Sequence, residues 1–221
     1  GTNTAADQAN SVGMHHDGMR FFPLNASSTD GLLCINHEYI DKKALHFKGA
    51  MRDAELIRKE INAHGVSVIR IQLKGNDWEV LANSPHNRRF TGATEMAMAG
   101  PVAMSSSLIT PFSPLGDKTR GTLNNCGNGY TPWGTYLTCE ENWPGYFVAD
   151  EATMTDDQIR IGLSSLVKGN RYNWHDQAGD TSEQNAEFSR FNVTPIGNSA
   201  LEDYRNEANG YGYVVEIDPY N

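Results

Sequence analysis

Short apolar runs separated by turn-forming residues dominate the N-terminal part of the chain. The runs GMRFFPL (18–24) and GLLCIN (31–36) are joined by NASSTD, and VSVIRIQL (66–73) alternates apolar and polar residues before KGND leads into WEVL (78–81). Alternation with a period of two is typical of half-buried strands, and short Gly- and Asn-containing connections favour hairpins. The pattern therefore predicts two β-hairpins.

Between these hairpins, AMRDAELIRKEINAHG (50–65) has a helical period. Its apolar residues recur at helical spacing from Met51 to Ile61, and Gly65 is suited to end a helix. We expect one amphipathic helix here. A second, short helix is expected around 93–97, where small residues and methionines show no clean period.

The rest of the chain is less regular. GTYLTC (134–139) and GYVVEID (212–218) indicate two further strands. The segment from about 144 to 209 between them is polar and irregular, and only 156–169 and 199–210 are candidate helices. We interpret it as an insertion within one domain that spans residues 1–221.

A loose recurrence links the strands to acidic residues. In three places a glycine opens a short apolar strand that ends in glutamate: Gly31 to Glu38, Gly134 to Glu140 and Glu141, and Gly212 to Glu216. A radial all-β fold can use such strand ends to direct carboxylates at a shared axis. A single strand-end glutamate is more often only solvated, but the shared lead-in favours convergence. The fold class we predict is all-β dominated: an incomplete β-propeller with helical and loop insertions.

Composition and charge restrict the possible partners. The 221 residues are 38% hydrophobic and 20% charged, as expected for a globular chain, and the formal net charge is −9. Nucleic-acid binding requires clustered Lys and Arg, so we expect no nucleic-acid partner. We also expect no membrane span, because no run approaches the ~18 apolar residues that one needs. A phosphate substrate stays possible, since bound cations reverse the local charge of an acidic site.

Candidate metal ligands gather in GTLNNCGNGYTPWGTYLTCEENW (121–143). Asn125 and Cys126 lie in a predicted Gly-rich loop, and Glu140 and Glu141 follow one strand later. A soft thiolate, an amide oxygen and hard carboxylates suit metal ions of unlike character. The alternative is that asparagines in such a loop only serve the turn.

The three cysteines, Cys34, Cys126 and Cys139, show no zinc-finger spacing. A disulfide between Cys126 and Cys139 is left open. Cys139 lies in an apolar alternation, and we expect it to be buried.

Other polar residues have weaker claims to a site. Arg88 and Arg89 could grip phosphate as bidentate donors, although arginine pairs more often lie on solvated faces or in salt bridges. Of His15 and His16, at most one could enter a site, because adjacent strand residues point to opposite faces. We expect His37, beside Glu38, to support a neighbouring ligand or the fold rather than to bind a metal itself.

The Cys-centred segment, together with SVGMHHDGMRFFPL, INHEY, NRRFTGATEMAMAGP and DYRNEANGYGYVVEIDPYN, resembles the PhoX family of alkaline phosphatases over nearly the whole chain. The resemblance implies a six-bladed β-propeller whose central channel holds ferric iron and calcium. Carried over by motif, Cys126 would bind iron, and Asn125, Glu140, Glu141 and Glu216 would bind calcium or iron. Glu38 in NHEY is a further candidate ligand.

The activity implied by the resemblance is hydrolysis of small-molecule phosphomonoesters by a periplasmic or secreted bacterial enzyme, monomeric when full length. A metal-bound oxygen would be the nucleophile, with cations neutralising the phosphoryl and leaving oxygens. The chain begins GTNTAADQAN, without signal-peptide features, and stops just after a strand. We therefore expect an N-terminal portion of a larger protein that is inactive alone.

Two other classes of function remain open. A different calcium-dependent propeller hydrolase, such as a lactonase or phytase, would use acidic residues similarly but would not need Cys126. A calcium-stabilised propeller could also serve only as a binding module. Metal analysis with visible absorption separates these possibilities, because thiolate- or oxo-bound ferric iron is coloured and calcium is not.

Overall fold

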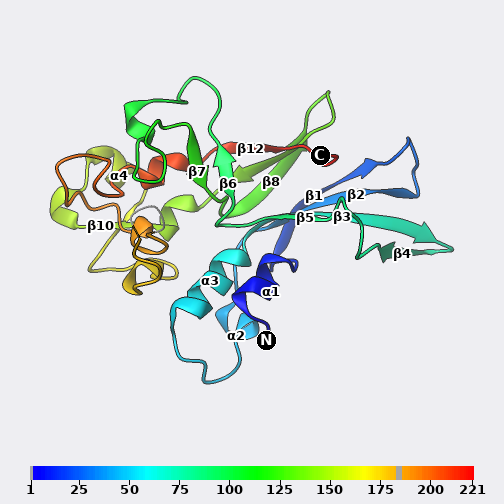
Figure 1. Cartoon of the computed structure of the whole chain (residues 1–221), viewed down its shortest axis with the longest axis horizontal. Helices are drawn as coiled ribbons and strands as arrows, with labels where there is room; N and C mark the ends of the chain where they lie inside the picture. The colour runs from blue at the N-terminus through cyan, green and yellow to red at the C-terminus, as the bar shows by residue number, and fades with distance from the viewer. Residues whose placement is uncertain (1, 183–185) are drawn as a thin grey trace. The chain divides into compact units, whose positions relative to one another are not determined.

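The computed structural model describes residues 2–182 and 186–221 (Figure 1). The chain is mostly β and its sheets are antiparallel apart from one two-stranded parallel pair. It divides into two units. Unit 1 comprises the described residues up to Thr94, Gly121–Glu141 and Tyr213–Asn221; unit 2 comprises Glu95–Arg120 and the described part of Asn142–Gly212.

Unit 1 contains two sheets and three helices. In the first sheet the order is β1-β2-β3-β4, with β5 also paired to β3, and in the second it is β12-β9-β8. The elements are α1 (Ala5–Ala9), β1 (His16–Pro23), β2 (Asp30–His37), α2 (Lys42–Leu45), α3 (Ala54–Asn62), β3 (Gly65–Lys74), β4 (Asp77–Val80), β5 (Arg88–Phe90), β8 (Asn125–Tyr130), β9 (Tyr136–Glu140) and β12 (Val214–Ile217).

The two sheets share a hydrophobic core. Side chains of both sheets meet in one buried cluster: Phe22, Leu32, Cys34, Val66, Val68, Tyr136 and Ile217. Both expected hairpins are confirmed, as β1–β2 and β3–β4, and so are the strands expected at 134–139 and 212–218. Burial alternates with a period of two in β9, whereas β2 is buried at almost every position and β4 at none.

The amphipathic helix is confirmed as α3, although it begins later than the apolar pattern suggested. The Asp53 carboxylate accepts a hydrogen bond from the Leu56 N–H at 2.9 Å and caps the helix, so Met51 lies outside it and is exposed. Gly65 does not close the helix but opens β3 with φ +98°, where a Cβ would lie 2.0 Å from the Phe90 carbonyl oxygen. Only glycine fits this close approach.

Unit 2 is poor in regular structure. Its strands form two small pairs, β6 with β7 and β10 with β11. The elements are β6 (Glu95–Ala97), β7 (Lys118–Arg120), β10 (Val148–Ala149), α4 (Asp156–Arg160), β11 (Ser164–Ser165) and the 3-10 helices Ser106–Leu108, Trp143–Tyr146, Glu151–Thr153, Trp174–Asp176, Ser189–Phe191 and Glu207–Gly210. The helix expected around 93–97 is wrong, because pairing with β7 makes Glu95–Ala97 a strand. The candidate helix at 156–169 is reduced to α4, and that at 199–210 to one 3-10 turn.

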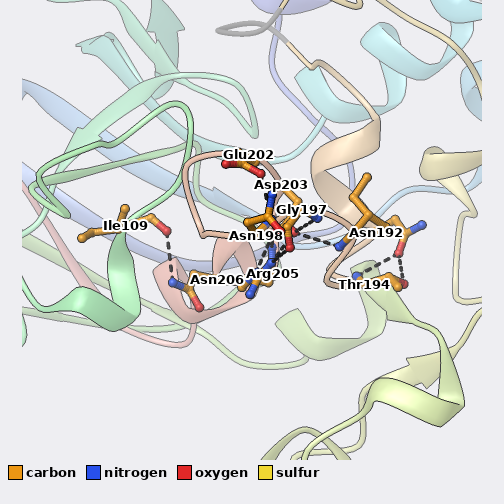
Figure 2. A network of polar contacts seen from close by, with 10 residues as sticks. Ile109, Asn192, Thr194, Gly197, Asn198, Glu202, Asp203, Arg205 and Asn206 are labelled. Carbon is orange, nitrogen blue, oxygen red and sulfur yellow. Dashed lines mark hydrogen bonds and ion pairs between the residues drawn. The ribbon is translucent and has the colours of Figure 1, made fainter.

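Polar contacts fix the irregular chain of unit 2. The buried Asp203 carboxylate accepts hydrogen bonds from the N–H groups of Ile196 (2.8 Å) and Gly197 (2.9 Å) and from both Nε (2.8 Å) and a terminal nitrogen (2.7 Å) of Arg205 (Figure 2). Burial alone would raise the pKa of Asp203, but these donors lower it below its usual value. The carboxylate therefore joins two turns of the loop.

Candidate metal site

Three potential metal ligands from separate segments of unit 1 lie together. They are Asp17 in β1, Glu38 directly after β2, and Cys126 in β8, and their ligand atoms all lie within 4.8 Å of one another. The register of β1 against β2 shifts between His16 and Met19. Such a bulge changes the direction in which a side chain points, and Asp17 lies within it.

Glu141 joins this group through the thiol. The Cys126 Sγ donates to Oε2 of Glu141 at 2.8 Å. Burial, together with Glu141, Asp17 and Glu38, raises the pKa of Cys126 above its usual value. We refer to Asp17, Glu38, Cys126 and Glu141 as the acidic cluster; its three carboxylates around one thiol oppose further negative charge unless a cation is bound.

The backbone of β8 is held close to β1 and β2. A Cβ on Gly18 would lie 2.7 Å from the Cys126 carbonyl oxygen, so glycine permits the approach of β1. The buried Asn36 amide donates to the same oxygen at 2.7 Å. Its own Oδ1 lies 2.9 Å from the Tyr136 hydroxyl, which is also 3.0 Å from the Gly18 carbonyl oxygen. These contacts position Cys126 beside the other two strands.

Asn124 ties the carboxylate-bearing segments together. Its side-chain amide donates to the main-chain carbonyl of Glu38 at 3.4 Å. Its main-chain carbonyl accepts a hydrogen bond from the Glu141 N–H at 3.0 Å. Asn124 is fully buried and adopts a left-handed conformation with φ +55°, which asparagine tolerates better than most residues. Asn124 thus fixes the backbone of two ligand candidates.

Asn125 offers an amide oxygen that the protein leaves unused. Its Nδ2 donates to the hydroxyls of Thr122 (2.7 Å) and Thr138 (3.2 Å). Its Oδ1 is buried and has no hydrogen-bond partner among the described residues. A buried, unsatisfied carbonyl oxygen is unfavourable, and a bound hard cation is one way to satisfy it.

Glu140 and Glu216 lie outside the acidic cluster. Glu140 is buried and accepts from the Thr122 hydroxyl (2.9 Å) and the Leu123 N–H (3.2 Å). Glu216 accepts from Trp133 Nε1 (2.7 Å) and from the Thr135 hydroxyl (2.5 Å), and the antiparallel register places it beside Leu137, near the start of β9 rather than its end. These glutamates have structural partners of their own.

The arginine pair binds main-chain carbonyl groups. Arg88 donates to the Asp218 carbonyl at 2.8 Å. Arg89 donates to the carbonyls of Asn62 (2.7 Å), His64 (3.0 Å) and Val66 (2.8 Å), and burial lowers its pKa to about 10. Both side chains thus link β5 to neighbouring segments of unit 1.

The histidines near the cluster take different roles. His15 stacks on Tyr39 with ring centroids 3.8 Å apart. His37 is fully buried, its Nε2 lies 2.6 Å from the Ser67 hydroxyl, and burial lowers its pKa to about 2. A neutral, hydrogen-bonded His37 matches the structural role expected for it.

The structure corrects two expectations about the cysteines. Cys139 is exposed rather than buried, because Tyr136, Thr138 and Glu140 occupy the inner face of β9. Cys126 lies in a bulged strand rather than a loop, since the Gly-rich segment pairs with β9. All three thiols are free, so Cys126 and Cys139 do not form a disulfide here.

Asp17 is the ligand candidate that sequence reasoning missed. It directly follows the histidine pair in MHHDGM, a motif that drew attention only to the histidines. A carboxylate followed by glycine at the start of a strand was the available signal, but nothing in the sequence showed that β1 would contact β8.

An antiparallel β protein that brings a thiol and three carboxylates to one place has the donor set of a metal-binding protein. Comparison with known proteins makes this class more specific. The family model described as alkaline phosphatase PhoX matches residues 2–221. The chain therefore belongs to the PhoX family.

A solved structure is also similar to the chain. Pseudomonas fluorescens PhoX in complex with vanadate, a transition state analogue, is 36% identical in sequence with a TM-score of 0.84. The similarity covers 100% of this chain and 35% of that chain. The search of curated proteins gave no match.

Proposed function

We propose that this chain provides part of the active site of a metal-dependent phosphomonoesterase, in which the acidic cluster binds iron and calcium. The observation that carries the proposal is the convergence of Asp17, Glu38 and Cys126 from separate segments within 4.8 Å. Family membership and the vanadate complex of the Pseudomonas fluorescens relative support a phosphoester substrate.

The donor set fits these metals. Thiolate suits iron, whereas carboxylate oxygens suit calcium. The cluster also needs positive charge, because three carboxylates face one thiol whose pKa they raise. Bound iron and calcium would stabilise the negative charge on the phosphoryl and leaving oxygens during transfer.

The chain's own contribution is to hold these ligands in place. Asn36 and Tyr136 fix the backbone of Cys126, and Asn124 fixes the segments of Glu38 and Glu141. Preorganised ligands reduce the reorganisation needed when charge develops at phosphorus. We further propose that the open antiparallel sheets form part of an incomplete six-bladed propeller in a periplasmic or secreted protein. No helix in the described residues is long and apolar enough to cross a membrane.

Metal analysis of the full-length protein combined with an activity assay tests the proposal. We expect purified enzyme to contain iron and calcium, to absorb visible light and to hydrolyse p-nitrophenyl phosphate. Chelation should abolish hydrolysis, and adding both metals back should restore it, whereas calcium alone should not. Full activity in an iron-free, colourless preparation would contradict the iron assignment, and an iron- and calcium-loaded protein without phosphatase activity would contradict the function.

A further inference from the structure

A concentrated run of positive charge stands out in this acidic chain. The chain has a formal net charge of −9, yet residues 42–52 carry four of its 18 Lys and Arg residues and no Asp or Glu. The cationic residues are Lys42, Lys43, Lys48 and Arg52, and His46 lies among them. They occupy α2 and the connection to α3, which Figure 1 shows as a loop beyond the two helices. The metal-site candidates are different residues.

The basic run lines a cavity. The cavity has a volume of about 740 Å³, within the range of small-molecule sites. Its lining residues are mainly basic or apolar: Lys42, Lys43, His46, Phe47, Lys48, Gly49, Ala50, Arg52, Leu56 and Glu60. Four permanent cations against one carboxylate leave the lining positively charged. We call it the basic pocket.

The pocket wall is held in place by buried polar contacts. Glu60 is 2% exposed and lies 3.4 Å from the Lys42 ammonium and 3.0 Å from His46 Nε2. Lys59, the residue before Glu60 in α3, donates to the Leu45 carbonyl at 2.9 Å. These contacts fix α2 against α3. Lys43 and Lys48, both exposed, place further positive charge at the pocket.

The same lining offers apolar surface. Phe47 is 58% exposed, and Ala50 and Leu56 are partly buried in the lining. An aromatic side chain between lysines is suited to a ligand with both an apolar and an anionic part, because the aromatic ring contacts the body while the ammonium groups contact the head.

We propose that the basic pocket binds a small amphipathic anion, in which a sulfonate, carboxylate or phosphate head is joined to an aromatic or acyl body. Charge attraction alone is weak at an exposed site and is screened by salt, so the apolar contact with Phe47 is needed for affinity. The binding does not depend on the phosphatase proposal.

Titration of the full-length protein with 8-anilinonaphthalene-1-sulfonate, followed by fluorescence, tests the inference. This probe has an aromatic body and an anionic head and contains no phosphoester bond to hydrolyse. We expect saturable binding that weakens with added salt and is displaced by naphthalene-1-sulfonate but not by equal concentrations of 1-naphthol or sulfate. If 1-naphthol or sulfate displaced the probe to the same extent as naphthalene-1-sulfonate, the pocket would not recognise both the apolar and the anionic part of the ligand.

Substitutions locate the binding. Lys43→Glu with Lys48→Glu should weaken the probe about tenfold or more, and Phe47→Ser several-fold, because opposite charge and apolar contact are both lost. Lys168→Glu, the same substitution at one exposed lysine of unit 2, should leave affinity within about twofold. Hydrolysis of p-nitrophenyl phosphate should persist in the double variant. Unchanged probe affinity in the double variant, or equal weakening in Lys168→Glu, would overturn the proposal.

Discussion

The Sγ atom of Cys126 lies 2.8 Å from Oε2 of Glu141, although the two residues come from different strand segments. The Glu141 N–H binds the Asn124 carbonyl, so Glu141 stands opposite Asn124 and diagonal to Cys126 on one face of the sheet. Glu140 and Asn125, which are paired in register, share the other face. Strand alternation therefore separates the adjacent glutamates into two roles.

Cys126→Ser should remove the soft ligand from the acidic cluster. We expect the iron content and the phosphatase activity of the full-length protein each to fall about tenfold or more, while the fold is retained. Changes at metal sites typically reduce metal affinity or activity by about this factor. Elemental analysis and p-nitrophenyl phosphate hydrolysis measure both effects. Cys139→Ser is the matched control, and because that thiol is exposed it should change stability by less than about 0.5 kcal/mol. A normal iron content in the Cys126→Ser variant would show that this thiol is not an iron ligand.

Asn36→Ala should destabilise the fold and loosen the cluster together. The buried amide bridges the Cys126 carbonyl and the Tyr136 hydroxyl, and its loss should lower the free energy of unfolding by about 2 kcal/mol. Urea denaturation gives the value, and metal titration of the folded protein shows whether affinity falls as well. Asn128→Ala removes an exposed amide with one 3.3 Å bond to the Met19 carbonyl and should cost less than about 0.5 kcal/mol. Equal losses in both variants would contradict the bridging role of Asn36.

Sequence patterns predicted local structure in this chain better than they predicted contacts between strands. The hairpins followed from short apolar or alternating runs separated by turn residues, and α3 followed from the helical spacing of its apolar residues. Alternation could also have separated Glu140 from Glu141. Asp17, by contrast, joins Cys126 only through the β1 bulge and the close approach at Gly18, and no local pattern encodes that contact between distant segments.

The shared-axis interpretation shows the same limit. Gly-to-Glu strands recur in the sequence, but Glu216 is paired beside Leu137 because β12 runs antiparallel to β9. The direction of a strand decides which end of the sheet its terminal glutamate reaches. The recurring glycine-to-glutamate pattern does not specify that direction. Glu38 and Glu141 reach Cys126, whereas Glu216 binds Trp133 and Thr135.

Asp203→Asn should destabilise unit 2 in a pH-dependent manner. The carboxylate holds Arg205 and two backbone N–H groups, and losing its charge should cost about 2 kcal/mol near neutral pH. Its folded pKa lies below the usual 3.8, so the stabilisation is fully present above about pH 5 and is lost as pH falls through 3.8 and then through the folded pKa.

Denaturation of both proteins between pH 7 and pH 3 measures this difference, which should narrow as the pH falls. Asp157→Asn is the control, since Asp157 forms an ion pair with Arg160 in which its side chain is 84% exposed, and it should change stability by less than about 0.5 kcal/mol. A wild-type advantage over Asp203→Asn that grows toward pH 3 would contradict the depressed pKa.

The carboxylates themselves provide the sharpest test of the metal site. Asp17→Asn and Glu141→Gln each remove one charge from the acidic cluster with little change in shape, so calcium and iron affinity should fall about tenfold or more. Glu216→Gln makes the same charge change at an exposed glutamate that binds Trp133 and Thr135, and it should retain its metals. Metal stoichiometry and competition with a chelator, measured on the three variants of the full-length protein, separate these outcomes. If Glu216→Gln lost its metals while Asp17→Asn retained them fully, the acidic cluster would not be the metal site. The metal ligands would then be the strand-end glutamates of the sequence pattern.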